Sequence, residues 1–333
     1  MKKPLVAITM GDAAGIGAEV ITKALSDVSI YEKCSPFVVG NSDALSDALI
    51  RSNSNSKVRV VHSILNLETS HGVIDVLDMS NLDFSKVEYG KLSPICGKAA
   101  VEWILKAGEM ASAGLVQAIC TAPINKEACD LAGYRDIGHM EIFQNQTNSK
   151  QVATMLVAGE LRVVHLTTHR SLRVACDHVT EENVLAKVRL TDHCFKNWGF
   201  EKPRIAVAAL NPHASDGGLL GNEEAKQISP AVVRAKSMGI DVTGPIPADT
   251  IFNQNIDGKF DVCIAMYHDQ GHIPIKVHDW KRSVSVNLGL PFVRTSVDHG
   301  TAFDISGEGI ADHTSMMESI RVAVSIVSDG VLP

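Results

Sequence analysis

The chain has 333 residues, of which 45% are hydrophobic and 21% are charged, and its formal net charge at pH 7 is -7. This composition is typical of a globular enzyme of one or two domains, and the acidic balance argues against a nucleic-acid-binding surface. No apolar run reaches the roughly 18 to 20 residues that a membrane-spanning helix needs, and the opening MKKPLVAITMGD lacks the pattern of a signal peptide, so we expect neither a membrane protein nor an exported one.

Short apolar runs alternate with longer amphipathic segments along the chain. The runs are rich in Val, Ile, Leu and Ala, which predicts strands buried on both faces: PLVAITM, PFVVG, VRVVHS, VQAICTAP, TMLVAG, LRVVHLTTH, RIAVAALNPH and DVCIAMYH. The segments between them, such as SPICGKAAVEWILKAGEMASAG, have the pattern of helices. This alternation predicts βαβ units, and therefore an α/β fold with a mainly parallel sheet.

Three of the predicted strands end at a histidine, namely His169, His213 and His268. Ligands of open parallel sheets bind outside the carboxyl ends of the strands, so these imidazoles are candidates for one shared site. Three neutral imidazoles suit Zn²⁺ or another divalent ion and leave coordination positions open for a substrate. We therefore predict a metal site at these three residues, although each histidine taken singly is better explained as a loop residue bonded to backbone.

Two further histidines, His165 and His272, each lie four residues from a candidate ligand. They would share a face with that ligand only if their segments were helices. The β-branched, alternating LRVVHLTTH predicts a strand, and Gly271 and Pro274 argue against a helix over HDQGHIPIK. Neither histidine is included in the predicted metal site.

The seven cysteines are irregularly spaced and contain no CxxC pair. An odd number in such a pattern argues against a disulfide framework and against a zinc-thiolate site. The pattern is typical of a reducing compartment, and we expect a cytoplasmic protein.

Other groups could supply binding or acid–base chemistry. MGDAAGIG follows the first predicted strand with glycines suited to a tight turn, but it does not fit the G-x-G-x-x-G dinucleotide fingerprint. Asp249 and Asp269 are candidate general bases, although Asp249 is also placed to cap a helix, and the sequence does not choose between them. Lys276 and Arg294 are candidate anion-binding residues, for which the alternative is a surface salt bridge.

Taken together, the motifs resemble the 4-hydroxythreonine-4-phosphate dehydrogenase family of pyridoxal phosphate biosynthesis. The matching stretches run in family order across nearly the whole chain: TMGDAAGIGAE, TAPINKEA, GHME, TTHRSL, NPHASDGGLLGNEE, GPIPADTIF, AMYHDQGHIPIK and LGLPFVRTSVDHGTAFD. The resemblance implies a two-lobed α/β fold like that of isocitrate and isopropylmalate dehydrogenases. It also implies a homodimer whose active site draws on both subunits. We expect residues 1–130 with 300–333 to form the cofactor-side lobe, and residues 131–299 to form the lobe for substrate, metal and dimerisation.

By the same resemblance, the enzyme oxidises a 4-phosphorylated hydroxy acid with NAD⁺ or NADP⁺ and then removes its β-carboxylate as CO₂. A divalent ion (zinc, magnesium or cobalt) is implied at the three strand-end histidines. The candidates for acid–base chemistry are Asp249, Asp269 and Lys276. The resemblance assigns the substrate to His139, Met140, Lys276, Ser285 and Arg294, and the nicotinamide cofactor to Gly300, Thr301, Ala302, Asp304 and Asp312.

Two positions depart from the family pattern, which commonly has GHTE and a downstream asparagine. Met140 replaces the threonine, and Ser285 falls at the asparagine, with Asn287 two residues further on. A change in the polar groups of a substrate site can shift specificity strongly. A paralogue acting on D-threonate or D-erythronate 4-phosphate is therefore an open alternative. A metal-dependent hydrolase and a catalytically idle metal-binding paralogue are alternatives of other classes.

Overall fold

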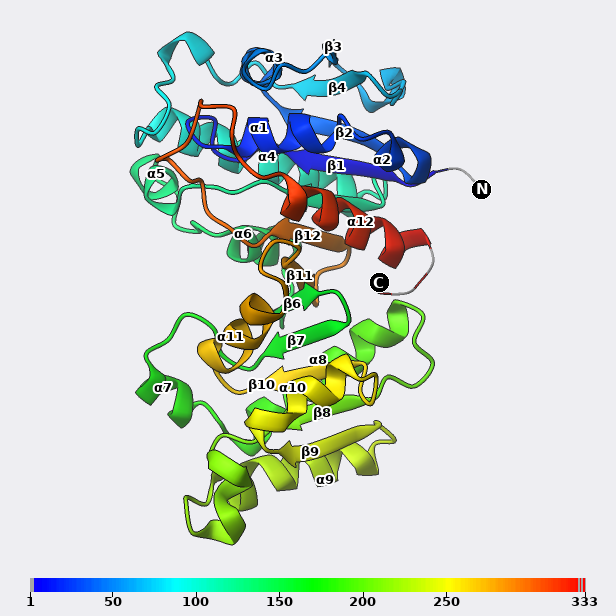
Figure 1. Ribbon diagram of the computed structural model, residues 1–333, viewed down its shortest axis with the longest axis vertical. Helices are drawn as coiled ribbons and strands as arrows, with labels where there is room; N and C mark the ends of the chain where they lie inside the picture. The colour runs from blue at the N-terminus through cyan, green and yellow to red at the C-terminus, as the bar shows by residue number, and fades with distance from the viewer. Residues whose placement is uncertain (1–2, 329, 331, 333) are drawn as a thin grey trace. The chain divides into compact units, whose positions relative to one another are not determined.

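The computed structural model describes residues 3–328, 330 and 332, and the chain divides into two compact units. The first unit comprises Met1–Lys150 and Leu290–Asp329, and the second comprises Gln151–Gly289 and Gly330–Pro333 (Figure 1). The boundaries lie at 150/151 and 289/290, whereas the predicted lobes meet at 130/131 and 299/300. The assignment of one lobe to the cofactor and the other to the substrate stays a prediction.

The first unit is built on a parallel sheet. Its strands follow the order β3-β4-β2-β1-β5-β12, and every neighbouring pair is parallel. The inner strands are nearly continuous apolar runs because both faces of the sheet are covered. The strands are β1 (Leu5–Thr9), β2 (Ser35–Gly40), β3 (Lys57–Val61), β4 (Val73–Asp78), β5 (Ala118–Thr121) and β12 (Val293–Val297).

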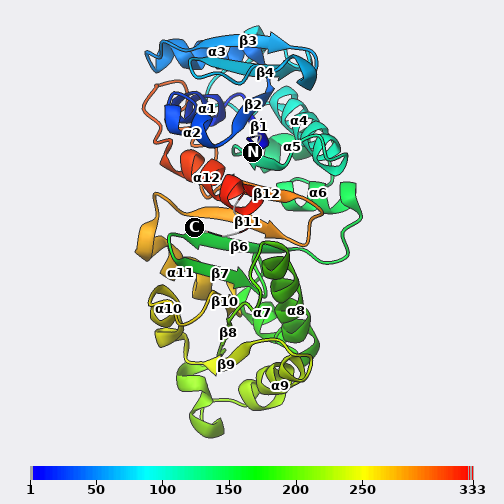
Figure 2. The same cartoon turned by 90° about the vertical axis from the view of Figure 1, so that its right-hand side faces the viewer.

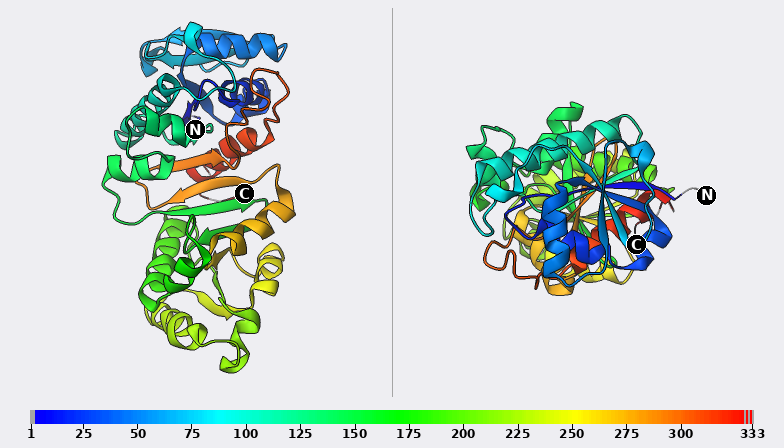
Figure 3. Two further views of the ribbon diagram at one scale, coloured as in Figure 1. Left: turned by 90° about the vertical axis from the view of Figure 1, so that its left-hand side faces the viewer. Right: turned by 90° about the horizontal axis from the view of Figure 1, so that it is seen from above.

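Helices cover both faces of this sheet. In Figure 2, α1 and α12 lie on one face and α4 lies on the other, and Figure 3 shows the same layers from the opposite side. Because the strands are parallel, the loops after β1, β5 and β12 meet at one edge of the sheet. The helices are α1 (Gly17–Ala24), α2 (Val28–Lys33), α3 (Ser42–Arg51), α4 (Pro94–Ser112), α5 (Lys126–Leu131), α6 (His139–Thr147) and α12 (Thr314–Ser328).

The second unit has a mixed sheet in the order β11-β6-β7-β10-β8-β9. The pairs β11/β6 and β6/β7 are antiparallel, and the remaining pairs are parallel. The strands are β6 (Ala153–Ala158), β7 (Leu161–His165), β8 (Ile205–Ala208), β9 (Val242–Ile246), β10 (Val262–Ala265) and β11 (Val284–Leu288). The predicted α/β class with mainly parallel sheets is confirmed.

Helices also cover both faces of the second sheet, with α10 and α11 on one face and α8 and α9 on the other (Figure 2). They are α7 (Leu172–Asp177), α8 (Glu181–Asn197), α9 (Ser229–Ser237), α10 (Ala248–Ile256) and α11 (His268–Asp279). In the described part of the chain, no helix combines the length and apolar character that crossing a membrane requires.

The three strands with a predicted terminal histidine end earlier than expected. β7 ends at His165, β8 at Ala208 and β10 at Ala265. His169, His213 and His268 therefore stand three to five residues beyond their strands, where the chain has already turned. Their positions depend on the geometry of the following loop or helix, and not on the sheet alone.

Candidate active site

A cavity of about 320 Å³ in the second unit lies where the chain leaves β7 and where α11 begins. It contains two of the three predicted metal histidines: the ring centroids of His169 and His268 are 5.7 Å apart. The lining residues are Thr168, His169, Arg170, Leu172, Ala175, Tyr267, His268 and Asp269. The structure thus brings His169, His268 and the candidate base Asp269 to one cavity.

The expectation that HDQGHIPIK is not helical is wrong, because α11 spans His268–Asp279 with Pro274 inside it. Packing outweighs the local cost of the proline and the glycine. A Cβ on Gly271 would lie 2.3 Å from His165 Nε2, so this glycine permits close packing of the helix on β7. The side chain of Gln270 also ties the first turn to two other segments, accepting from Met266 N at 2.7 Å and donating to Ala209 O at 2.8 Å.

A row of imidazoles runs from this cavity into the core. His268 and His272 stack with ring centroids 3.6 Å apart, and His272 lies 4.5 Å from His165. His165 is buried, and burial lowers its pKa to about 3, with the neighbouring His272 as the second cause. His165 and His272 are omitted from the sequence-based prediction, yet they pack behind His268. The signal that could have found His272 is its i,i+4 spacing from His268 on a helix.

The first turn of α11 also orients His268 itself. Its Nδ1 lies 2.6 Å from Asp269 Oδ1, a hydrogen bond that leaves Nε2 as the nitrogen with a free lone pair. His268, His272 and Lys276 follow one another at intervals of four residues and so share one face of α11. The other candidate base, Asp249, lies exposed in the first turn of α10.

His213 is not part of this group. It lies in the segment Pro212–Gly218, where residues 213–217 all have positive φ, and its side chain is 67% exposed. Its Nδ1 lies 3.3 Å from Asp216 Oδ2. Within residues 3–328, 330 and 332, no group of three or more His, Cys, Asp and Glu side chains is placed to hold a metal ion. A single chain therefore does not fit the predicted three-histidine site, and the metal assignment stays a prediction.

In the first unit, two predicted substrate residues, Arg294 and His139, lie close together, and Arg294 carries a positive charge there. Arg294 on β12 is 5% exposed, and its Nη2 donates to Thr121 Oγ1 at 2.5 Å. Burial lowers the pKa of Arg294 to about 9, so the guanidinium is still charged at neutral pH. Burial also lowers the pKa of His139, at the start of α6, well below its usual 6.5, and the charges of Arg294 and Lys126 add to the effect. A buried cation, a neutral imidazole and a lysine together suit an anionic group.

Thr121 is a residue of this site that the sequence does not single out. Besides accepting from Arg294, its hydroxyl donates to Ser296 Oγ at 2.9 Å, and Ser296 Oγ donates to Thr121 O at 3.1 Å. This network fixes the guanidinium at the carboxyl end of β5. The ring nitrogen Nε2 of His139 is buried and has no hydrogen-bond partner among the described residues, so it is available to a ligand.

The remaining predicted substrate residues lie on regular elements. Met140 is the second residue of α6 and is half-buried. Ser285 and Asn287 lie two apart on β11, so their side chains share one face of the sheet, about 7 Å apart along the strand. Asn287 is buried and Ser285 half-buried. The structure therefore places an amide on the same face as the substituted position, one rung further along.

Two glycine-rich segments of the first unit, MGDAAGIG after β1 and the predicted cofactor loop that begins at Gly300, lie against each other. Ile16 N donates to Thr301 O at 3.1 Å, and a Cβ on Gly15 would lie 2.9 Å from Thr301, so only a glycine allows this approach. In the predicted cofactor loop, Gly300 and Asp304 are exposed, Ala302 has φ +44°, and Asp312 Oδ1 accepts from Thr314 N at 2.9 Å. Asp312 is exposed as well, so the loop is open to solvent at three of its predicted cofactor positions.

Asp12, in the first of these segments, is expected to destabilise the protein at neutral pH. It is 1% exposed, and its Oδ2 is buried without a hydrogen-bond partner among the described residues. Burial raises the pKa of Asp12 to about 6, although the N–H of Ala14 opposes the shift. The unfolded chain ionises first, near pH 4, so stability is full below that pH and is lost as the pH rises to about 6, by about 3 kcal/mol.

Asp12→Asn should therefore raise the melting temperature at pH 8 and leave it nearly unchanged at pH 4. The gain at pH 8 should correspond to about 2 kcal/mol, since the new amide group is itself buried and costs part of the benefit. Thermal unfolding of both proteins across this pH range measures the difference. An equal shift at both pH values would show that ionisation of Asp12 is not the cause.

Comparison with known proteins places the chain among close relatives. A family model described as "Pyridoxal phosphate biosynthetic protein PdxA" matches residues 32–323. A protein of Oceanobacillus iheyensis named "Putative D-threonate 4-phosphate dehydrogenase" is 43% identical over 328 residues, which cover 98% of each chain. The crystal structure of a 4-hydroxythreonine-4-phosphate dehydrogenase from Burkholderia phymatum is 42% identical, with a TM-score of 0.88 over 98% of this chain and 99% of that chain. A β-decarboxylating dehydrogenase from Thermococcus kodakarensis shares only the fold, at 15% identity and a TM-score of 0.51 over 97% of this chain and 83% of that chain.

Proposed function

The chain belongs to the PdxA family and is an oxidoreductase acting on a CH–OH group, and from this membership we propose that it oxidises and decarboxylates a 4-phosphorylated hydroxy acid with NAD⁺ or NADP⁺. D-Threonate 4-phosphate is the first candidate substrate, and 4-hydroxythreonine 4-phosphate and D-erythronate 4-phosphate are the others. The observation that carries this proposal is the buried Arg294 guanidinium beside His139 and Lys126, which suits a phosphate or a carboxylate.

The proposed reaction has two steps. Hydride leaves C3 of the acid for the nicotinamide ring, and the hydroxyl proton goes to a base, for which Asp249, Asp269 and Lys276 are the candidates. The resulting β-keto acid then loses C1 as CO₂, and the electron pair of the broken bond forms an enolate that takes up a proton. From D-threonate 4-phosphate, this balance leaves dihydroxyacetone phosphate, CO₂ and reduced cofactor. Arg294 and His139 would hold the anionic groups in place throughout.

We propose a cytoplasmic homodimer with a shared site. His169 and His268 lie together in one subunit, and a third ligand such as His213 would then come from the second subunit. The loop that begins at Gly300 is the proposed cofactor site, with Thr301, Ala302, Asp304 and Asp312. A bound zinc, magnesium or cobalt ion would supply Lewis-acid chemistry, and no step above is assigned to it.

The test is a screen for reduced nicotinamide by absorbance. Wild-type protein is incubated with NAD⁺ or NADP⁺ and each of the three 4-phosphorylated acids, with and without a chelator, and the carbon product is identified by mass spectrometry. Reduced cofactor and a decarboxylated product on at least one acid support the proposal. The absence of both on all three acids, with metal supplied, would reject it and would favour the hydrolase or the idle paralogue.

Substrate choice is expected to depend on Met140 and Ser285. Met140→Thr combined with Ser285→Asn restores a hydroxyl and an amide, which should raise kcat/KM for 4-hydroxythreonine 4-phosphate relative to D-threonate 4-phosphate by about tenfold or more. The ratio of the two kcat/KM values is the measurement. Asn287→Ala serves as a comparison, because Asn287 shares the face of β11 with Ser285. An unchanged ratio in the double variant would place discrimination elsewhere.

A further inference from the structure

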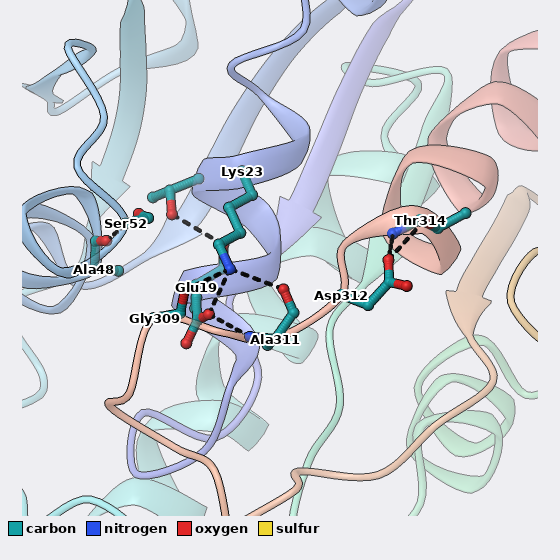
Figure 4. Close-up of polar contacts among 9 residues, drawn as sticks. Glu19, Lys23, Ala48, Ser52, Gly309, Ala311, Asp312 and Thr314 are labelled. Atoms are coloured by element: carbon teal, nitrogen blue, oxygen red, sulfur yellow. Dashed lines mark hydrogen bonds and ion pairs between the residues drawn. The ribbon is translucent and has the colours of Figure 1, made fainter.

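The glycine-rich loop of residues 300–312 is held against α1 by two charged side chains (Figure 4). Glu19 Oε1 accepts from Ala311 N at 2.6 Å and from Lys23 Nζ at 2.8 Å. Lys23 Nζ also donates to Gly309 O at 2.8 Å and to Ala311 O at 2.9 Å. An ammonium group has three N–H donors, so these contacts use all of them. We call Glu19 and Lys23 the α1 latch.

The α1 latch is well suited to hold a loop. Its two residues are four apart on α1 and therefore lie on the same helix face. The side chains of Glu19 and Lys23 are only 6% and 19% exposed, so water does not compete strongly for their hydrogen bonds. Lys23 is also in the last turn of α1, where a positive charge is favoured by the helix dipole.

The first half of the loop has apolar anchoring, since Ala302, Phe303 and Ile305 pack against the hydrophobic core, whereas in the second half only Ala311 joins it. Among residues 300–312 only Ala311 is buried, and Ile310 is 63% exposed. The other ties of its second half are polar as well: Arg51 Nη1 donates to Gly307 O at 2.8 Å. Residues 309–311 are therefore held by the hydrogen bonds of the α1 latch together with the burial of Ala311.

We propose that Glu19 and Lys23 are positioning residues for the nicotinamide cofactor, because they hold residues 309–311 in the conformation that the cofactor binds. This inference rests on the proposed function, which places the cofactor at this loop. A loop that is already ordered loses little freedom when a ligand binds. Without the α1 latch the loop would be competent only part of the time, and the apparent Kd rises by the inverse of that fraction.

The test compares a double variant with a matched control. Glu19→Gln with Lys23→Met removes both charges and leaves no lone buried ion, and Glu19→Gln alone, which keeps the side-chain shape, is the second variant if the double variant does not fold. The control is Lys98→Met on α4, which breaks another i,i+4 pair, with Glu102, on the same unit. The Kd values of NAD⁺, NADP⁺ and D-threonate 4-phosphate are measured by fluorescence titration, and loop opening by amide hydrogen exchange of residues 300–313.

We expect the α1-latch variants to raise the Kd of the cofactor by about tenfold and to speed exchange of the loop amides, with the Kd of the acid unchanged. The Lys98→Met control should match the wild type in the Kd of the cofactor, the Kd of the acid and the exchange rate of the loop amides. If the wild type binds cofactor and the variants bind it equally well, the inference is overturned while the proposed function stands. Equal loss of affinity for cofactor and acid would also overturn it, as a general structural effect. If the wild type binds neither NAD⁺ nor NADP⁺, the proposed function fails, and the role of the α1 latch in cofactor binding fails with it.

Discussion

Replacing Arg294 by methionine is expected to lower kcat/KM for a 4-phosphorylated hydroxy acid by about a thousandfold, mainly through KM. The guanidinium is 5% exposed and is oriented by Thr121, so a bound phosphate or carboxylate would meet a fixed, desolvated cation. Removing one partner of such a buried charge pair costs about 2 to 5 kcal/mol of binding free energy. Methionine keeps much of the side-chain length and removes every donor. Steady-state kinetics on D-threonate 4-phosphate measures the effect.

The stability of the fold should not follow the loss of activity. Because burial lowers the pKa of Arg294 to about 9, the charged form at pH 7 is held at a cost to the folded state, and an apolar side chain removes that cost. We expect the melting temperature of Arg294→Met to equal or exceed that of the wild type. The matched control is Arg321→Met on α12, whose guanidinium is 40% exposed and pairs with Asp27 and Glu318. Wild-type KM in Arg294→Met would show that the residue has only a structural role.

The fold could be predicted because its signals are local. Runs such as VCIA in β10 are short and apolar without interruption, which is the pattern expected of a strand covered on both faces. The helix at His268–Asp279 could not be predicted in the same way. Its glycine and proline count against a helix locally, and the contacts that outweigh them, from Gly271 to His165 and from Gln270 to Ala209, join residues far apart in the sequence.

In the candidate site, too, local sequence signals could be predicted and contacts between distant residues could not. Arg294 is suggested by its position in FVRTS, but the threonine that orients it is 173 positions away and carries no signal of its own. Likewise, NPH predicts a histidine just beyond a strand, yet the run of positive φ at residues 213–217 sets where His213 points, and nothing in NPHASDGG requires it. Residue types at strand ends therefore identify candidate ligands, whereas loop geometry decides which of them meet.

His213→Ala is expected to lower kcat/KM by about a thousandfold or more and to reduce the bound divalent metal, with no change in the melting temperature of the metal-free protein. The side chain of His213 is 67% exposed, and its contact with Asp216 at 3.3 Å is exposed too, so the fold gains little from either. A large loss of activity would then report on the site and not on stability. The control is His193→Ala on α8, an exposed histidine whose Nε2 lies 3.1 Å from Asn197 Nδ2. Elemental analysis and kinetics of the purified proteins give both quantities.

His213 does not join His169 and His268 within one chain. Mixing variant subunits can therefore test whether His213 completes the site of the other subunit. His213→Ala and His268→Ala proteins are each expected to be inactive. If the site is shared, a mixed dimer has one site that lacks both histidines and one that keeps both. Random exchange would then restore about a quarter of the wild-type sites, since half of the dimers are mixed. If all ligands came from one chain, mixing would restore nothing. Retention of both metal and activity in His213→Ala alone would remove this residue from the ligand set and leave His169 and His268 as the candidates.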